Sequence, residues 1–169
     1  MTRVGPRLIL LCGLPGAGRT TEAKRLARSL PAVRLCPDEW LSALGLDLFD
    51  ETARERVERQ LWSHAQDLLA RGEIVILENG FWERAERDEK RQRAHELGAA
   101  VELRYLAVPT AELNRRIAPR NRTPGAAIIT PGLIARYEAL FEAPTESERA
   151  LFDPPVELSD PRPGSGPPG

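Results

Sequence analysis

The sequence predicts a three-layer α/β fold in which a parallel sheet of about five strands is covered by helices on both faces. Three observations lead to this prediction. Apolar runs alternate with amphipathic stretches, residues 73–78 are apolar almost throughout, and a glycine-rich segment directly follows the first apolar run. Regular alternation of strand and helix patterns is typical of parallel sheets, whose strands are buried on both faces. Ligands of such sheets bind at the carboxyl ends of the strands.

The first half of the chain is expected to contain three strands, at residues 7–12, 32–36 and 73–78. A helix is predicted over residues 20–30, because Ala23, Leu26, Ala27 and Leu30 fall on one face at helical spacing. Residues 37–41 are interpreted as a loop that enters a short helix. A long amphipathic helix over residues 50–71 is expected to end at Gly72, which suits the position after a helix terminus.

The second half continues the alternation. A helix over residues 82–97 is expected to stop at Gly98, and a fourth strand follows at residues 100–107. Thr110 is interpreted as the cap of a helix over residues 110–118. After a loop at residues 121–131, a helix is predicted over residues 132–141, and residues 156–158 are interpreted as a short fifth strand.

Length and composition suit a single domain. The chain has 169 residues, of which 1–158 are assigned to the domain and the Pro/Gly-rich residues 159–169 to a flexible tail. A net charge of −1 and a pI near 6.2 provide no general attraction to nucleic acid or anionic membranes. No membrane-spanning run or signal peptide is apparent, so a cytoplasmic protein is expected. Cys12 and Cys36 are interpreted as buried thiols, since neither they nor the two histidines have metal-ligand spacing.

The segment from Gly13 to Thr20 reads G-x-x-x-x-G-R-T, which is the pattern of a phosphate-binding loop with one residue changed, between a predicted strand and a predicted helix. In such a loop, backbone N–H groups and the helix N-terminus bind phosphate oxygens, and the final hydroxyl binds Mg²⁺. Thr20 supplies that hydroxyl. The residues expected to bind the nucleotide are Gly13, Leu14, Pro15, Gly16, Ala17, Gly18, Arg19, Thr20 and Thr21. The alternative is a glycine-rich turn without a ligand.

One position of the loop departs from the usual pattern. Arg19 stands where a lysine normally reaches the β- and γ-phosphates. The planar guanidinium is bulkier than an ammonium and is not equivalent to it. Phosphate binding is therefore predicted more firmly than catalysis.

Carboxylates follow two of the predicted strands. Asp38, and after it Glu39, lie just past the second strand, where a carboxylate can accept the proton of an attacking hydroxyl. The alternative for Asp38 is a helix N-cap after Pro37. Glu78 ends the third strand and is expected in the shell of the magnesium ion, or else is a polar residue of a strand–helix turn.

Substrate-contacting residues are expected beside these carboxylates. Asn79 adds an amide that could meet substrate, and Trp40 and Trp82 are interpreted as walls of an acceptor pocket, with core packing as the alternative. Trp62 is assigned to the core. Arg84 and Arg87 are set apart because they lie in the first turn or two after the third strand, and Arg84 is added to the substrate candidates; the other arginines of that helix are interpreted as an exposed, ion-paired face.

Four arginines cluster between residues 115 and 122 with little acidic compensation. Arg116 and Arg120 are the candidates for a lid whose guanidinium groups close over the phosphates and stabilise the charge of the transfer. A plain basic helix face is the alternative.

The segments at residues 13–21, 35–40 and 77–84 resemble a family of short bacterial P-loop proteins described as AAA-type ATP-binding or kinase-like. More distantly they are similar to polynucleotide 5′-kinase, zeta toxin, chloramphenicol phosphotransferase and the shikimate and gluconate kinases. The resemblance covers about residues 7–153. It implies a P-loop kinase fold, ATP and Mg²⁺ as cofactors, Asp38 as general base and Arg116 or Arg120 in the lid. Arg19, and Glu78 in place of the more usual aspartate, depart from the family pattern.

The function expected from these residues is transfer of the ATP γ-phosphate to a hydroxyl of a small molecule, such as an antibiotic, a nucleoside or a sugar. One alternative is a kinase of nucleic-acid 5′-hydroxyls, which would need a basic groove. Another is a nucleotide-binding protein without turnover, favoured by Arg19, and a third is a toxin-like kinase of a nucleotide sugar. The acceptor and the oligomeric state are not fixed by the sequence.

Overall fold

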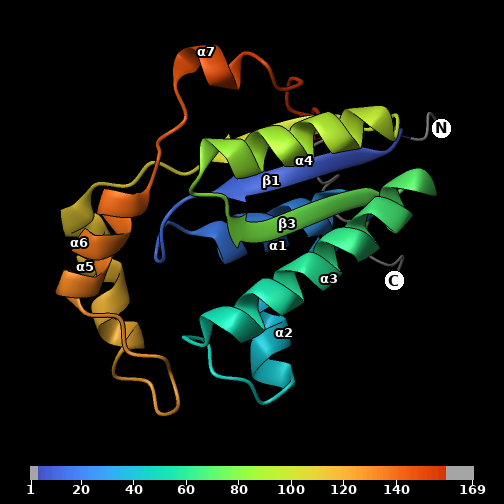
Figure 1. Ribbon diagram of the computed structural model, residues 1–169. Coiled ribbons are helices and arrows are strands. Elements are labelled where there is room, and N and C mark those ends of the chain that lie inside the picture. Colours follow the sequence, from blue (N-terminus) through green and yellow to red (C-terminus); the bar gives the residue numbers. More distant parts are fainter. Residues whose placement is uncertain (1–3, 159–169) are drawn as a thin grey trace, which may run out of the picture.

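The computed structural model describes residues 4–158 and contains a parallel sheet at its centre (Figure 1). Within these residues the sheet has four strands in the order β2-β3-β1-β4, with all neighbours parallel. The strands are β1 (Arg7–Cys12), β2 (Ala32–Leu35), β3 (Ile74–Gly80) and β4 (Ala100–Tyr105). The predicted α/β class with a parallel sheet is confirmed.

The expected fifth strand at residues 156–158 is wrong, because this segment is irregular. Asp153 makes a single pairing with β4: its N–H donates to the Val101 carbonyl, and its carboxylate accepts from the Val101 N–H. Pro154 and Pro155 follow, and proline has no N–H to continue a ladder. Val156 instead packs against the apolar cluster that contains α1 (Arg19–Ser29), whereas Val101 belongs to the cluster on the other face of the sheet.

Seven helices lie within the described residues, and most fall close to their expected positions. They are α1 (Arg19–Ser29), α2 (Pro37–Ala43), α3 (Glu51–Ala70), α4 (Arg84–Glu96), α5 (Thr110–Arg120), α6 (Pro131–Leu140) and α7 (Glu146–Arg149). The short helix α7 was not anticipated, and α2 begins at Pro37 without a preceding loop. Gly72 and Gly98 follow α3 and α4 with positive φ, as expected.

The cap predicted at Thr110 is wrong. Pro109 occupies the cap position of α5, and no side chain caps this helix. Thr110 is the first helical residue, and its hydroxyl instead bonds the carboxylate of Glu138 on α6. The hydroxyl thus links two helices.

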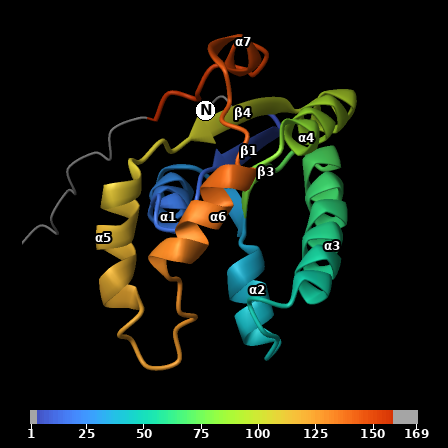
Figure 2. The same cartoon turned by 60° about the vertical axis from the view of Figure 1, so that its left-hand side comes forward.

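Successive residues of β1 face opposite layers, which explains why the strand is apolar throughout. Leu8, Leu10 and Cys12 pack with residues of α3 and α4, whereas Ile9 and Leu11 pack with α1. A third apolar cluster, beyond the carboxyl ends of the strands, joins the glycine-rich loop to α5 and α6. Figure 2 shows α5 and α6 on one side of that end and α2 and α3 on the other.

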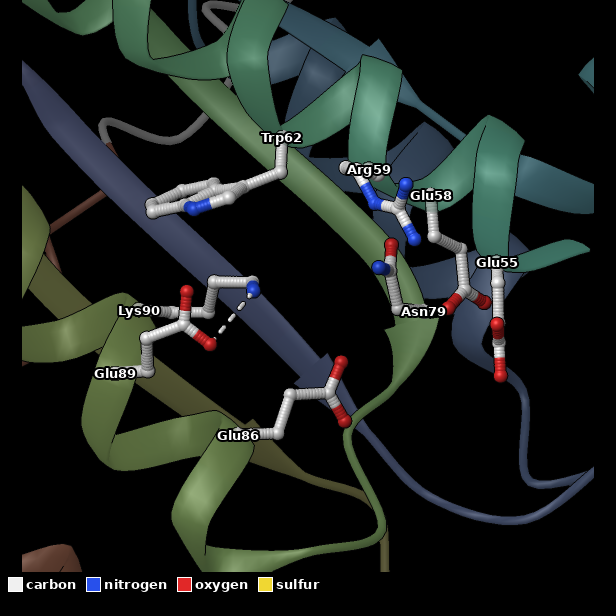
Figure 3. Close-up of a pocket in the computed structure, with 8 residues that line it drawn as sticks. All are labelled: Glu55, Glu58, Arg59, Trp62, Asn79, Glu86, Glu89 and Lys90. Carbon is white, nitrogen blue, oxygen red and sulfur yellow. Dashed lines mark hydrogen bonds and ion pairs between the residues drawn. The ribbon is translucent and has the colours of Figure 1, made fainter.

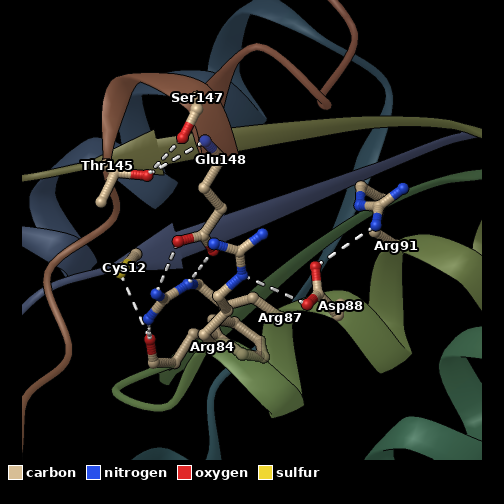
Figure 4. A network of polar contacts seen from close by, with 9 residues as sticks. Cys12, Arg84, Arg87, Asp88, Arg91, Thr145, Ser147 and Glu148 are labelled. Carbon is tan, nitrogen blue, oxygen red and sulfur yellow. Dashed lines mark hydrogen bonds and ion pairs between the residues drawn. The ribbon is translucent and has the colours of Figure 1, made fainter.

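A buried ion pair fastens α7 to the start of α4 (Figure 4). The guanidinium of Arg87 donates to both carboxylate oxygens of Glu148, at 2.6 and 2.9 Å, and its third nitrogen donates to the Phe81 carbonyl at 2.8 Å. Arg87 and Glu148 are 0% and 1% exposed at their side chains. The segment after α6 is therefore held onto the sheet by charge as well as by apolar contact.

Both cysteines are free and buried, as expected. Burial raises the pKa of the Cys12 thiol to about 12 and that of Cys36 to about 11, so both are protonated at neutral pH. Between residues 4 and 158, no helix is long and apolar enough to cross a membrane. The tail expected at residues 159–169 lies outside the described residues.

Candidate functional site

The glycine-rich loop connects β1 to α1 at the carboxyl edge of the sheet. Gly16 and Gly18 have φ values of 84° and 97°, which other residues rarely adopt. A Cβ on Gly16 would lie 2.9 Å from Ile117, so the close packing of α5 against the loop also requires glycine. At the start of the loop the Gly13 N–H donates to the Gly80 carbonyl at 3.0 Å. The loop is thus fixed by β3 on one side and by α5 on the other.

Arg19, the first residue of α1, directs its side chain toward the end of β3. Its Nη1 donates to the Glu78 carbonyl at 3.1 Å, and a Cβ on Gly80 would come within 2.8 Å of this nitrogen. No carboxylate of the described residues forms an ion pair with Arg19. Burial lowers the pKa of the guanidinium, while the charge of Asp38 opposes that shift. A half-buried cation that lines the cleft and has no carboxylate partner suits an anionic ligand.

Thr20 and Glu78, the two residues expected beside the magnesium ion, are in contact with each other. The Thr20 hydroxyl donates to Glu78 Oε1 at 3.0 Å. The other carboxylate oxygen accepts from Arg34 of β2, whose Nη2 lies at 2.8 Å. Burial raises the pKa of Glu78, whereas the charge of Arg34 and the bond from Thr20 oppose this. The buried carboxylate is thereby balanced by a cation.

Asp38 lies in the first turn of α2 and faces the same edge of the sheet. The alternative role as an N-cap is wrong, since Cys36 is the cap residue and no side chain caps α2. The carboxylate of Asp38 pairs instead with Arg54 of α3, at 2.8 Å from Nη2. Arg54 also donates to the Leu48 carbonyl, and its Nη1 lies 3.7 Å from Glu58. Arg54 thus orients one oxygen of a carboxylate that is otherwise open to solvent.

A single cleft of about 1330 Å³ is lined by Arg19, Thr20, Asp38 and Arg54, whereas Glu78 and Arg34 are not among its lining residues. Its walls include the glycine-rich loop, the first turn of α1, Asp38 and the facing surfaces of α5 and α6. The arginines that line it are Arg19, Arg54, Arg116, Arg120 and Arg136. The cleft therefore brings the glycine-rich loop together with these five arginines and with six carboxylates, those of Glu22, Asp38, Glu51, Glu58, Glu83 and Glu86.

The two lid candidates both line this cleft from α5. Nη1 of Arg116 contacts the carbonyls of Gly16 and Ala17 at 3.3 and 3.4 Å, and its Nε donates to Glu112. Arg120 lies one turn further on. Arg116 is therefore at the mouth of the loop, whereas Arg120 has no such contact among the described residues.

Trp82 and Asn79 also line the cleft, next to the end of β3. The Trp82 indole donates to the Gly13 carbonyl at 3.3 Å, and its ring lies 4.8 Å from that of Tyr137 on α6. Asn79 Oδ1 is buried and has no hydrogen-bond partner among the described residues. Trp62 is buried in the core, as predicted.

Three substrate candidates lie away from the cleft. Glu39 pairs with Arg34 at 3.0 Å and is directed toward β2. Trp40 is 46% exposed and lines no part of the cleft, so neither a pocket wall nor core packing describes it. Arg84 pairs with Asp88 on the surface of α4. The helical turns of α2 and α4 direct all three side chains away from the cleft, which adjacency in sequence does not reveal.

The residues of the site fit a nucleotide and a magnesium ion. The positive φ of Gly16 and Gly18 would strain any residue with a Cβ, and a Cβ on Gly16 would also collide with Ile117. Arg19 provides a cation for phosphate. Thr20 and Glu78 offer two oxygen ligands, and phosphate and water usually supply the rest for Mg²⁺. In the part of the chain that the structure describes, no group of three or more His, Cys, Asp and Glu could hold a metal by itself.

Sequence reasoning missed three cleft or near-cleft arginines: Arg34, Arg54 and Arg136. Arg34 alternates out of the apolar pattern of β2, which is a weak signal for a buried partner. Arg54 and Arg136 reach the site only through the way in which α3 and α6 pack. No local pattern could have identified them.

The model of a protein family described as an AAA domain matches residues 8–144. No curated protein sequence matches the chain. Among solved structures, the chain is similar to one from the Pnkp1/Rnl/Hen1 RNA repair complex, with a TM-score of 0.69 and 22% identity over 90% of this chain. It spans about half of that protein, 48% of its length.

Two further structures are covered more completely. A gluconokinase from Sinorhizobium meliloti 1021 matches with a TM-score of 0.60 and 19% identity, over 87% of this chain and 81% of that one. A sugar kinase from Janibacter sp. HTCC2649 matches with a TM-score of 0.58 and 21% identity, over 84% and 81%. At these identities the likeness establishes the fold, which is that of the P-loop kinases.

Proposed function

Because this chain belongs to the AAA domain family and has the P-loop kinase fold, we propose that it transfers the γ-phosphate of ATP to a hydroxyl of a small molecule. One observation supports the proposal above the others. A loop suited to phosphate, the Thr20 hydroxyl and the Asp38 carboxylate all line the same cleft, and the hydroxyl is bonded to Glu78. Phosphoryl transfer requires little more than such positioning and charge stabilisation.

In this proposal each group has a distinct role. The N–H groups of the loop, Arg19 and Arg116 bind the phosphates, while Thr20 and Glu78 hold the magnesium ion. When bound, Mg·ATP supplies the phosphoryl group and neutralises part of its charge. Arg34 offsets the charge of Glu78 until the cation is present.

Asp38 would orient the acceptor hydroxyl and take up its proton. Arg54 bonds Oδ1 at 2.8 Å, which leaves Oδ2 as the oxygen that faces the acceptor. Arg120 and Arg136 lie on the opposite side of the cleft, on α5 and α6. From there they can approach the transferred group if these two helices close over it.

A second candidate function, nucleotide binding without turnover, is favoured by the position of Arg19. Its guanidinium bonds a carbonyl of β3, so part of its donor capacity is used within the protein. A lysine in this position would leave a point charge free to follow the phosphate during transfer. The two functions differ in transfer, and both predict ATP binding.

The test is ATP binding by calorimetry, together with transfer from labelled ATP to a panel of antibiotics, nucleosides, sugars and 5′-hydroxyl oligonucleotides. The unsubstituted chain is compared with Arg19→Lys, Asp38→Asn and Arg84→Met, the last of which alters a surface arginine outside the cleft. We expect a labelled small-molecule product that Asp38→Asn lowers by roughly 10²-fold or more and Arg84→Met leaves unchanged.

Each other outcome favours a named alternative. Transfer by Arg19→Lys alone would assign the unsubstituted chain to nucleotide binding. Labelling of the oligonucleotides, with affinity that falls steeply with salt, would identify a nucleic-acid kinase, as the RNA repair relative would suggest. Absence of Mg·ATP binding in all variants would refute the proposal.

A further inference from the structure

A second, smaller cavity lies between α3 and α4, beside the end of β3 (Figure 3). Its volume is about 290 Å³, which is enough for a small polar substituent but not for a nucleotide. Glu58, Asn79 and Glu86 line both this cavity and the main cleft. A molecule bound in the cleft can therefore extend one of its groups into the cavity.

The cavity has an excess of negative charge. Glu55 and Glu58 line it from α3, and Glu86 and Glu89 line it from α4. The cations that face it are Arg59 and Lys90. The Lys90 ammonium is partly engaged, because it lies 3.5 Å from Glu89 and 4.8 Å from the centre of the Trp62 ring.

Two acceptors in the cavity lack partners. The side-chain carboxylate of Glu86 forms no hydrogen bond or ion pair with the residues that the structure describes. Asn79 Oδ1, on the β3 side, is buried and equally unpaired within residues 4–158. An unpaired buried acceptor is costly, so Asn79 Oδ1 points to a ligand that donates hydrogen bonds, and the half-buried Glu86 carboxylate lines the same cavity.

The surroundings of Glu86 disfavour its charge. Burial raises the pKa of Glu86 to about 7, and the carboxylates of Glu58, Glu83 and Glu89 add to the shift, while Lys90 opposes it. Burial likewise raises the pKa of Glu58, where Arg54 and Lys90 oppose the shift and Asp38 adds to it. A cation between Glu58 and Glu86 would remove this repulsion.

We propose that this cavity binds a protonated amino group of the phosphate acceptor, so that the substrates are amino alcohols such as amino sugars. That the amine belongs to a substrate rests on the proposed function. The preference of the cavity for a cation does not, because it can be measured without phosphoryl transfer. Arg54 connects the two parts of the site, since it bonds Asp38 and lies 3.7 Å from Glu58. An amine in the cavity would thus leave a neighbouring hydroxyl directed toward Asp38.

The experiment uses three probes of similar shape and different charge: 2-amino-1,3-propanediol, glycerol and glycerate. Binding to the full chain is followed by NMR through the side-chain amide of Asn79 and the backbone amides of α4. We expect the amine to bind roughly tenfold more tightly than glycerol at pH 7.5, as one added charge-assisted hydrogen bond implies, and glycerate to bind least. The preference is expected to shrink at pH 6, where Glu86 becomes protonated.

Glu86→Gln should abolish the preference, while Glu96→Gln should retain it. Glu96 is on the same helix and is exposed, so this control removes the same charge outside the cavity. Equal binding of amine and glycerol, preference for glycerate, or equal effects of the two variants would overturn the inference.

The transfer assay separates this inference from the proposed function. Phosphorylation confined to neutral or anionic acceptors would refute the amine site and retain the kinase. Amine binding with no phosphorylated product in any variant would retain the site and refute the kinase.

Discussion

Replacing Arg87 by methionine should destabilise the protein far more than any surface arginine would. The Arg87 and Glu148 side chains are 0% and 1% exposed, and Arg87 makes three hydrogen bonds, two to Glu148 and one to the Phe81 carbonyl. Methionine fills a similar volume but leaves the Glu148 carboxylate buried without its cation. Removing one partner of such a pair costs about 3–5 kcal/mol.

For a chain of 169 residues, each kcal/mol corresponds to about 2–4 °C in the melting temperature. The expected loss is therefore about 6–20 °C, measured by circular dichroism and checked by urea denaturation. Arg84→Met is the matched control on the same helix, because its ion pair with Asp88 is exposed and should contribute less than about 1 kcal/mol.

The double variant Arg87→Met/Glu148→Met tests the reason for the loss. It removes both charges together and should recover most of the stability, since a buried pair replaced by apolar side chains is often neutral. If Arg87→Met costs no more than Arg84→Met, or if the double variant is worse than the single one, the reasoning about an uncompensated charge is wrong.

Three other changes have definite expected results. Gly80→Ala should lower stability by about 1–2 kcal/mol in urea denaturation, because φ is 90°, and should weaken ATP binding in calorimetry, because the new Cβ meets Arg19 and Trp82; unchanged affinity would contradict this. Burial raises the pKa of Glu86 from 4.5 to about 7 in the folded state. The contribution of Glu86 to the free energy of unfolding is therefore highest below pH 4.5, where its carboxyl group is neutral, and it falls as the pH rises to 7. Glu86→Gln should therefore stabilise the protein by about 2–3 kcal/mol at pH 8 and hardly at pH 4.5, and equal effects at both pH values would refute the assignment. Glu78→Gln should reduce the gain in ATP affinity that Mg²⁺ provides by roughly tenfold while leaving metal-free ATP binding intact, and an undiminished gain would exclude Glu78 from the metal site.

Much of the fold could be predicted because it depends on local periodicity and on a few strong signals. The predicted bounds of β1 are those observed, and the apolar face of α1 packs as its spacing implied. The exceptions arise from long-range contacts. β3 continues through Asn79 to Gly80, two residues beyond its apolar run, because the Gly80 carbonyl accepts from the Gly13 N–H.

The candidate site likewise has a part that local sequence patterns predicted and a part that depends on long-range contacts. The loop, Thr20 and Glu78 follow from a motif and from the rule that ligands bind at the carboxyl ends of strands, and these residues do meet. The partners of the carboxylates could not be predicted, because Arg54 reaches Asp38 from another helix and Arg34 reaches Glu78 from another strand. Such ion pairs depend on how elements pack, which no pattern within one element contains.

The pairing of β1 determines when the nucleotide site can form during folding. Arg7 pairs with Ile74 on one side and with Ala100 on the other, and the first amide of the loop is fixed by Gly80. The loop cannot reach its final shape until β3 has docked, after a long stretch of chain has been closed, and such distant pairings make folding slow. ATP therefore has little to bind before the sheet is complete. Its stabilising effect should appear almost entirely as slower unfolding, with the rate of refolding unchanged.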